Sequence, residues 1–176
     1  MPPLHPAAPH DAPRIAALHA RSWQENYTAA MSATYLQQEA PAERLAVWTE
    51  RFAHPAPGMR VLLAEDDDGE LLGFSCLFLD HHSEDGSLLD NLHVRADQQG
   101  TGLGKRLMQA TARLVLAEAQ NDKLYLWVLD SNTRARAVYE RLGGRVGRSE
   151  QHHMPGTGPE GVAATSMHWR AGELLE

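Results

Sequence analysis

The segment from Gln99 to Lys105 constrains the fold of this chain more than any other. It is written Gln-Gly-Thr-Gly-Leu-Gly-Lys and lies between an apolar, strand-like run and a long amphipathic run. A strand, a glycine-rich turn and a helix in that order leave unpaired backbone N–H groups at the positive end of the helix dipole, where an anion binds favourably. The segment therefore predicts a strand-turn-helix unit that binds a phosphate group.

Two well-known phosphate loops do not fit this segment. A nucleotide-triphosphate loop needs a glycine where Gln99 stands and a hydroxyl side chain where Arg106 stands. A dinucleotide loop that began at Gly100 would lack its last glycine, and the unit lies mid-chain rather than in a βαβ repeat. The pattern that fits is Gln/Arg-x-x-Gly-x-Gly/Ala, in which the defined positions are Gln99, Gly102 and Gly104.

A second motif follows about thirty residues later. After the apolar run 124–129 come Asn132, Ala135, Tyr139-Glu140 and Gly143. With the glycine loop before it, this order resembles the acetyl-CoA loop and the Asn-x-x-Ala-x-x-x-Tyr-Glu-x-x-Gly pattern of the GCN5-related N-acetyltransferases, the GNAT superfamily. The resemblance is specific over residues 88–144, and Gly144 stands where the family usually has an aromatic residue.

The resemblance implies acetyl-CoA as co-substrate. The pyrophosphate would lie on the loop N–H groups, and the pantetheine arm would pair with the strand before the loop. Tyr139 would protonate the departing thiolate, since a phenol with a pKa near 10 keeps its proton at neutral pH. Asn132 would bind the arm, cap the next helix, or do both. By resemblance, the cofactor contacts are Leu92, His93, Val94, Gln99, Gly100, Thr101, Gly102, Leu103, Gly104, Lys105, Asn132 and Tyr139.

The general base is left open. Leu88 and Trp127 stand where some relatives carry a glutamate. The candidates are Asp90, which shares strand parity with Leu88; His93, on the other face or moved by a bulge; and Glu25, from the N-terminal helices. Each could instead be structural or solvent-facing. An acceptor amine of low pKa, or a proton relay through water, would need no strong base.

Fewer residues in the sequence indicate where the acceptor binds or whether a metal site exists. Trp23, Tyr27 and Tyr35 lie where relatives build the acceptor pocket, although Trp23 also continues the spacing of a helix core. The ten histidines form no helical His-x-x-x-His pair with a carboxylate partner, so no metal site is expected.

Composition bounds the remaining possibilities. A chain of 176 residues that is 43% hydrophobic predicts one domain, 1–176, with at most a short edge strand in the proline-rich residues 1–10. The net charge of −7 argues against nucleic acid as a partner and favours a cationic acceptor. Cys76 is the single cysteine, and neither a signal peptide nor a membrane-length apolar run occurs. We expect a cytoplasmic protein without a membrane partner, with a homodimer possible by resemblance.

Hydrophobic periodicity and turn residues give the order of the elements. The apolar face of the helix after the loop is expected to carry Leu103, Leu107, Ala110, Leu114 and Ala117. The expected helices are about 11–23, 41–53, 103–117 and 133–142, and the strands are 59–65, 70–79, 88–94, 124–129, 145–151 and 162–169, with a polar loop at 81–87. Together with the resemblance, this order predicts an α/β (α+β) fold. It has a mixed sheet of six to seven strands, about four helices on both faces, and a splay between the fourth and fifth strands.

The function predicted is transfer of acetyl from acetyl-CoA to a primary amine of a small molecule or peptide, by direct attack in a ternary complex. Cys76 lies outside both motifs and gives no support to an acyl-cysteine intermediate. Two alternatives stay open: a noncatalytic acyl-CoA-binding module, and a transferase for a longer acyl group.

Overall fold

A seven-stranded mixed sheet forms the centre of the molecule, with the strands in the order β1-β2-β3-β4-β5-β7-β6. The computed structural model describes residues 1–176. The strands are β1 (Leu4–Pro6), β2 (Met59–Glu65), β3 (Leu71–His82), β4 (Gly86–Val94), β5 (Lys123–Leu129), β6 (Arg145–His152) and β7 (Val162–Arg170). The helices are α1 (Ala12–Asn26), α2 (Ala40–Ala53), α3 (Leu103–Glu118) and α4 (Thr133–Arg141).

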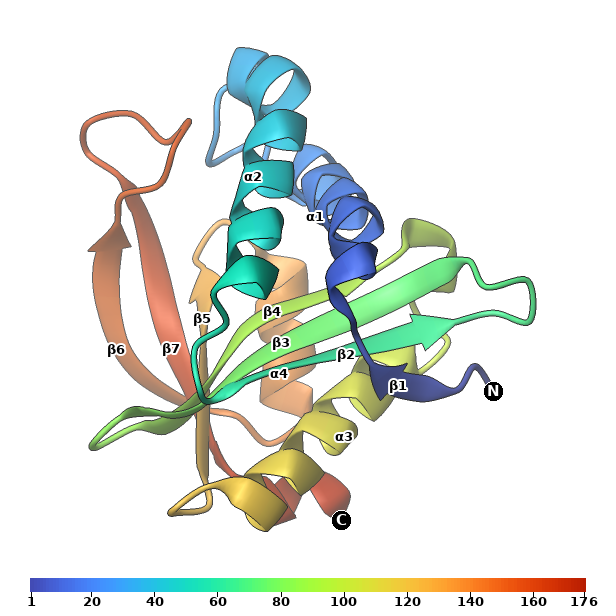
Figure 1. Cartoon of the computed structure of the whole chain (residues 1–176). Helices are drawn as coiled ribbons and strands as arrows, with labels where there is room; N and C mark the ends of the chain where they lie inside the picture. The colour runs from blue at the N-terminus through green and yellow to red at the C-terminus, as the bar shows by residue number, and fades with distance from the viewer.

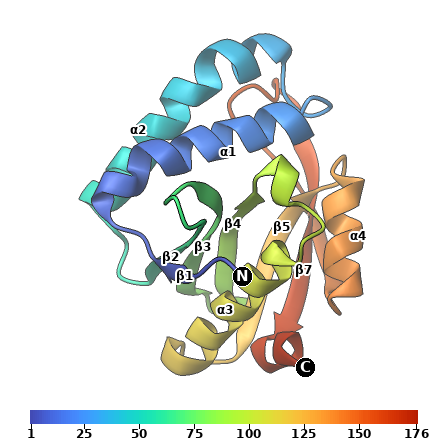
Figure 2. The ribbon, with the colours of Figure 1, turned by 90° about the vertical axis from the view of Figure 1, so that its right-hand side faces the viewer.

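Helices cover both faces of this sheet (Figures 1 and 2). In both views α1 and α2 lie together over one face, and α3 lies on the other. Trp48 of α2 and Phe74 of β3 are fully buried between the first helix pair and the sheet. On the opposite face, α3 and β5 share a second apolar cluster against which Leu142, just after α4, also packs. The expected fold class is confirmed.

Turn chemistry accounts for the first half of the sheet. The Asp66 carboxylate accepts the backbone N–H groups of Asp68 and Glu70, at 3.0 and 2.9 Å, and Gly69 takes a positive φ of 82°. A residue without a Cβ adopts that conformation at no steric cost, so the predicted β2–β3 hairpin closes here. The polar loop predicted at 81–87 is shorter, because β3 continues to His82 and β4 begins at Gly86.

The apolar face of α3 differs from the expectation. Ala117 is exposed, and Ala110 and Leu114 are half-buried. The helix is turned so that its bulkier apolar residues meet the sheet, and the polar Thr111 on this face approaches Ser75 Oγ at 3.4 Å. The residues buried on this face are Leu103, Leu107, Met108, Thr111, Ala112 and Val115.

The sheet opens between β4 and β5. These two strands are parallel and pair only at Ser87 with Leu124 and at Leu88 with Tyr125. Beyond these pairs, β4 continues beside β3 and β5 continues beside β7, so the two strands separate. The pairing between β3 and β4 also shifts at Asp90, since Leu77 pairs with Leu89 while Cys76 pairs with Asn91. Asp90 is therefore the extra residue of a β-bulge.

Four short helical turns have no counterpart in the sequence analysis, among them the 3₁₀ turns Pro9–Asp11 and Ala96–Gln98. A π-helical turn, Tyr35–Glu39, precedes α2, and a 3₁₀ turn, Ala171–Leu175, follows β7. No helix of the structure combines the length and the apolar character that a membrane crossing requires.

Candidate active site

The glycine loop joins β4 to α3 and leaves backbone donors free. A 3₁₀ turn (Ala96–Gln98) follows β4, and Gly100 and Gly102 then take φ values of 80° and 88°. No hydrogen-bond acceptor in the protein faces the N–H groups of Gly100 and Gly102, or those of Leu103, Gly104 and Lys105. A Cβ at Gly100 or Gly102 would meet nothing within 4 Å. Open space and unpaired donors at a helix start are typical of an anion site.

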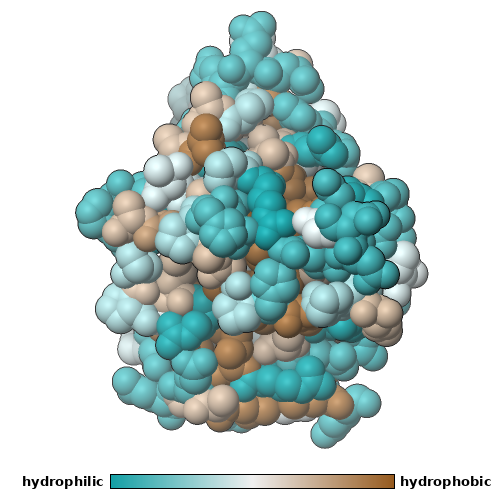
Figure 3. Space-filling model, turned by 45° about the vertical axis from the view of Figure 1, so that its right-hand side comes forward, coloured by the Kyte–Doolittle hydropathy of each residue, from teal (hydrophilic) through white to brown (hydrophobic).

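A cavity of about 430 Å³ runs from this loop to α4. Its wall includes Leu92, His93 and Val94 of β4 and Trp127 and Val128 of β5, so it occupies the region where the sheet opens. Figure 3 shows brown apolar side chains in recesses between teal hydrophilic ones on the face that it presents. The other lining residues include Gln99, Gly100, Gly102, Gly104, Lys105, Asn132 and Tyr139. We call this space the loop cavity.

A second cavity of about 290 Å³ lies on the α1 and α2 side. Its wall includes Trp23 of α1, Tyr27 directly after α1, Arg44 and Arg51 of α2, and Pro155 after β6. We call this space the α1–α2 cavity. The residues that line both cavities are Tyr27, Leu92, His93, Trp127 and Tyr139. The two spaces thus share a common wall deep in the protein.

Tyr139 reaches the common wall from α4. Its ring packs edge-on against Trp169, with 6.0 Å between the ring centroids. Burial, followed by the neighbouring Tyr27, raises the pKa of Tyr139 above its usual value. The phenol is therefore protonated at neutral pH. Asn132 stabilises the start of α4, because its Oδ1 accepts the N–H of Ala135 at 3.3 Å. Asn132 is thus an N-cap residue that also lines the loop cavity.

His93 reaches the common wall from β4. Its Nδ1 lies 2.7 Å from Ser22 Oγ, and its ring centroid lies 4.6 Å from that of His19. Burial, followed by the positive charge of Arg44, lowers the pKa of His93 to about 4. The ring is therefore neutral at physiological pH.

The other two candidate bases are placed differently. Asp90 lines the α1–α2 cavity from the bulge, but its Oδ2 accepts a hydrogen bond from Arg51 Nη2 at 2.7 Å. The Arg51 guanidinium also donates to Asn91 Oδ1 at 2.8 Å. Glu25 is exposed on α1 and lines neither cavity. His93 alone of the three borders both cavities.

Two of the three aromatic residues expected at the acceptor pocket line the α1–α2 cavity, and the third does not. Trp23 and Tyr27 stack with 5.8 Å between centroids, and both line the α1–α2 cavity. Trp23 is only 7% exposed and belongs to a core cluster as well. Tyr35 is buried, donates to Glu43 Oε1 at 2.9 Å, and lines neither cavity.

Several wall residues have no motif and escaped the sequence analysis. Arg44 carries its guanidinium over the Trp23 ring, 4.3 Å from the centroid, and Ser22 holds His93. His152 packs edge-on against Trp127 at 4.7 Å. Hydrophobic periodicity around Trp23 and Trp48 predicts helices that contain Ser22 and Arg44. It does not show that these two side chains face a cavity.

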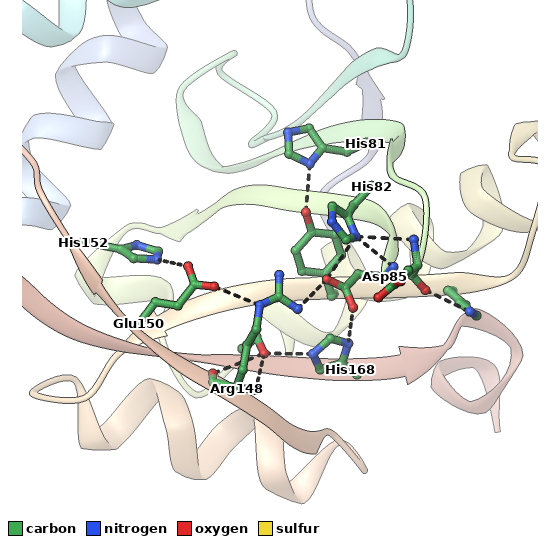
Figure 4. Close-up of polar contacts among 11 residues, drawn as sticks. His81, His82, Asp85, Arg148, Glu150, His152 and His168 are labelled. Atoms are coloured by element: carbon green, nitrogen blue, oxygen red, sulfur yellow. Dashed lines mark hydrogen bonds and ion pairs between the residues drawn. The ribbon is translucent and has the colours of Figure 1, made fainter.

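A polar network supports this wall from outside (Figure 4). Arg148 joins Glu150 and Asp85, at 2.9 and 2.6 Å, and its guanidinium lies 5.1 Å from the Trp127 centroid. Through these contacts β6 is tied to the turn between β3 and β4. No group of three or more His, Cys, Asp or Glu side chains in this network or elsewhere is arranged to hold a metal ion.

We expect the free energy of unfolding to fall as the pH drops from about 6.5 towards 4. Burial, the largest cause, holds the pKa of His93 at about 4 and that of His19 well below its usual value. In the unfolded chain both titrate near 6.5, so the unfolded state binds more protons in this window and stability rises with pH. His93 alone contributes roughly 2–4 kcal/mol, since one pKa unit is worth about 1.4 kcal/mol.

Urea denaturation at a series of pH values between 7.5 and 4.5, roughly the range in which histidine titrates, measures this slope. The variant His93→Gln should flatten it, whereas the change of an exposed histidine, His10→Gln, should leave it unchanged. An unfolding free energy that stays constant across this range would contradict the buried, neutral state of the two rings.

A family comparison decides what this arrangement belongs to. Residues 14–144 match a model of the acetyltransferase (GNAT) family. The chain belongs to the GNAT acetyltransferase family. It is an acetyl-CoA-dependent N-acetyltransferase by family, and the sequence prediction is confirmed in this respect. A probable N-acetyltransferase of Mycobacterium tuberculosis is 27% identical over 142 residues, which cover 78% of this chain and 76% of that protein.

Solved structures share the fold. A GCN5-related N-acetyltransferase from Rhodopseudomonas palustris superposes with a TM-score of 0.73 at 23% identity, over 97% of this chain and 96% of that one. The PaiA N-acetyltransferase of Thermoplasma acidophilum, solved in complex with coenzyme A, gives a TM-score of 0.73 at 15% identity, over 96% of this chain and 99% of that one. Both similarities cover nearly the whole length of this GNAT protein.

Proposed function

We propose that this GNAT protein transfers acetyl from acetyl-CoA directly to a primary amine of a small molecule or short peptide, within a ternary complex. One observation carries the proposal: the loop cavity and the α1–α2 cavity share a wall that contains Tyr139 and His93. A thioester held from one side and an amine held from the other would meet at that wall.

The loop supports the donor half of the proposal. The free N–H groups between Gly100 and Lys105 would bind the pyrophosphate, each charge-assisted hydrogen bond contributing about 1.5–3 kcal/mol. The glycines leave the space in front of these donors open. Where β4 and β5 separate, an extended pantetheine arm could take the place of the missing strand partner beside Leu92 and Val94.

Tyr139 supports the chemical half. Acetyl-CoA supplies a thioester to the amine: a C–N bond forms, the C–S bond breaks, and the thiolate needs a proton. Tyr139 lines both cavities and keeps its proton at neutral pH, because burial raises its pKa. A positioned phenol of this kind serves as a general acid.

No strong base is available in the site for the proton that the attacking amine must lose. His93 is neutral and can accept a hydrogen bond, but a pKa of about 4 makes the ring a poor store for a proton. Asp90 is engaged by Arg51. An α-amine of pKa near 7.8 costs only about 1 kcal/mol to deprotonate at pH 7, against roughly 4.6 kcal/mol for a lysine-type amine. We therefore propose an acceptor of low amine pKa, with His93 and Ser22 passing its proton towards water.

Cys76 supports direct transfer over an acyl-enzyme. Burial raises the pKa of its thiol to about 12, and the side chain lies in the core beneath α2 and lines neither cavity. A thiol in that environment is a poor nucleophile.

We expect initial-rate plots for acetyl-CoA and an acceptor to intersect, as a ternary complex requires, and the variant Cys76→Ser to keep the activity. A thiol-release screen over amino acids, peptides, polyamines and aminoglycosides would find the acceptor, and longer acyl-CoAs would test the acyl chain. Parallel rate lines, with loss of turnover in Cys76→Ser, would contradict direct transfer.

A further inference from the structure

The wall of the α1–α2 cavity contains two arginines, each of which is paired with one carboxylate. Two guanidinium groups, those of Arg44 and Arg51, and one carboxylate, that of Asp90, belong to its wall. The net charge of −7 is spread over the whole chain and does not describe this space. The cationic acceptor expected from the sequence would therefore find no unpaired carboxylate in this wall.

The two arginines differ in how fully they are used. Arg51 is fixed by hydrogen bonds to Asp90 and Asn91 and by its place over the Trp48 ring, at 4.9 Å from the centroid. Arg44 Nη2 donates to Glu43 Oε1 at 2.8 Å. Its Nε is buried and has no hydrogen-bond partner, and the side chain as a whole is only 11% exposed.

An orphaned donor of this kind is costly. A buried N–H without an acceptor loses its hydration without compensation, and the penalty is larger on a charged group. Nε has no surface open to a ligand, but Nη1 has no partner in the protein and is not buried. An anionic group that entered the α1–α2 cavity would form a charge-assisted hydrogen bond with Nη1. The Arg44 guanidinium, although it pairs with Glu43 through Nη2, thus keeps a donor for a second anionic group.

The rest of the wall describes the body of the ligand. It is aromatic and aliphatic, and a volume of about 290 Å³ suits a small molecule. A polyamine would need several carboxylates, whereas the single one here, Asp90, is already paired with Arg51. The apolar and aromatic lining residues are Trp23, Tyr27, Leu89, Leu92, Leu126, Trp127, Leu129, Met154 and Pro155.

We propose that the acceptor carries a carboxylate as well as its amine, with the Arg44 guanidinium binding the carboxylate and the apolar wall packing an apolar side chain. This is the chemistry of an apolar amino acid or dipeptide. The inference rests on the proposed amine acetylation and specifies its acceptor. It also agrees with the absence of a strong base, because a peptide α-amine has a pKa near 7.8.

Leucylleucine and its C-terminal amide provide a matched pair of probes, since they share the same α-amine and differ in the carboxylate. Calorimetric titration in the presence of coenzyme A should give tighter binding of the free acid, by about 10- to 100-fold. The same preference should appear in kcat/KM for thiol release. The variant Arg44→Gln should reduce the acid-to-amide ratio to near unity, whereas Arg21→Gln, an exposed arginine on α1, should keep it.

Three outcomes would contradict the inference or the acetylation on which it rests. Equal binding of acid and amide, or preferred binding of spermidine, would overturn the inference even if an amine is acetylated. Binding of 3-aminopropylphosphonate in preference to leucine and leucylleucine would replace the carboxylate by a phosphate-type group and so overturn it as well. If leucylleucine binds through Arg44 but no amine releases thiol, the acceptor site stands and the proposed acetylation fails.

Discussion

Replacing Tyr139 with phenylalanine is expected to lower kcat by about 100- to 10,000-fold, the usual contribution of general acid catalysis. The change removes only the hydroxyl group, so the ring keeps its edge-on contact with Trp169. Without a nearby proton, the thiolate must leave as an anion in a cavity whose lining is largely apolar. The affinity for coenzyme A should change little, because the loop donors are untouched.

The comparison needs a tyrosine whose hydroxyl is bonded away from both cavities. Tyr125 is such a residue, since its hydroxyl lies 2.8 Å from His81 Nδ1 and it lines neither space. Tyr125→Phe should cost about 0.5–1.5 kcal/mol of stability and leave kcat unchanged. Thiol release under saturating substrates measures kcat, and calorimetry measures the affinity for coenzyme A. A Tyr139→Phe enzyme of unaltered kcat would remove Tyr139 from the chemistry.

The sequence predicted those parts of the fold that local chemistry determines. Pro41 in the first turn of α2 and Asp66 in the β2–β3 hairpin act over a few residues, and the elements they bound appear where expected. Gly100 and Gly102 have positive φ values that other residues adopt only at a cost, so the loop is visible in the sequence as well. Family resemblance added Tyr139 and Asn132, whose side chains do meet the loop cavity.

The rest depends on contacts between distant segments. Asp90 is a plausible base by strand parity, but Arg51 from α2 engages its carboxylate, and no local pattern connects residues 39 positions apart. The sequence around His93 suits a surface residue equally well, whereas the packing of α1 buries the ring against His19 and Ser22. The bulge at Asp90 is likewise a property of the β3–β4 pair rather than of β4 alone.

The face of α3 was misjudged for a related reason. Two apolar stripes share Leu103 and Leu107 and then diverge, one through Ala110 and the other through Met108. Periodicity weighs both stripes alike, whereas the sheet offers a large apolar surface that Met108 fills better than an alanine. The size of the partner surface, which the sequence of α3 does not contain, decides between them.

Replacing Gly104 with leucine is expected to weaken acetyl-CoA binding by about 100- to 10,000-fold, the loss of two charge-assisted hydrogen bonds. Gly104 lies in the first turn of α3 and lines the loop cavity. A Cβ there would meet only Val94 Cγ2, at the ordinary contact distance of 3.8 Å, and the residue does not have a positive φ. The fold should therefore accept the side chain, which would extend over the free N–H groups that the pyrophosphate needs.

A second leucine variant on α3 distinguishes blocking of the loop N–H groups from a general effect of a leucine on this helix. Ala117→Leu adds a similar side chain at an exposed position of α3, remote from the loop cavity, and should leave the affinity unchanged. Gly102→Leu, by contrast, would place a side chain at a φ of 88° and should cost about 1–2 kcal/mol of stability besides blocking the site. Calorimetric titration with coenzyme A and thermal melting of the three variants give both quantities. If Gly104→Leu binds coenzyme A as tightly as the unaltered chain, the pyrophosphate does not approach this loop, because the leucine would stand in its path.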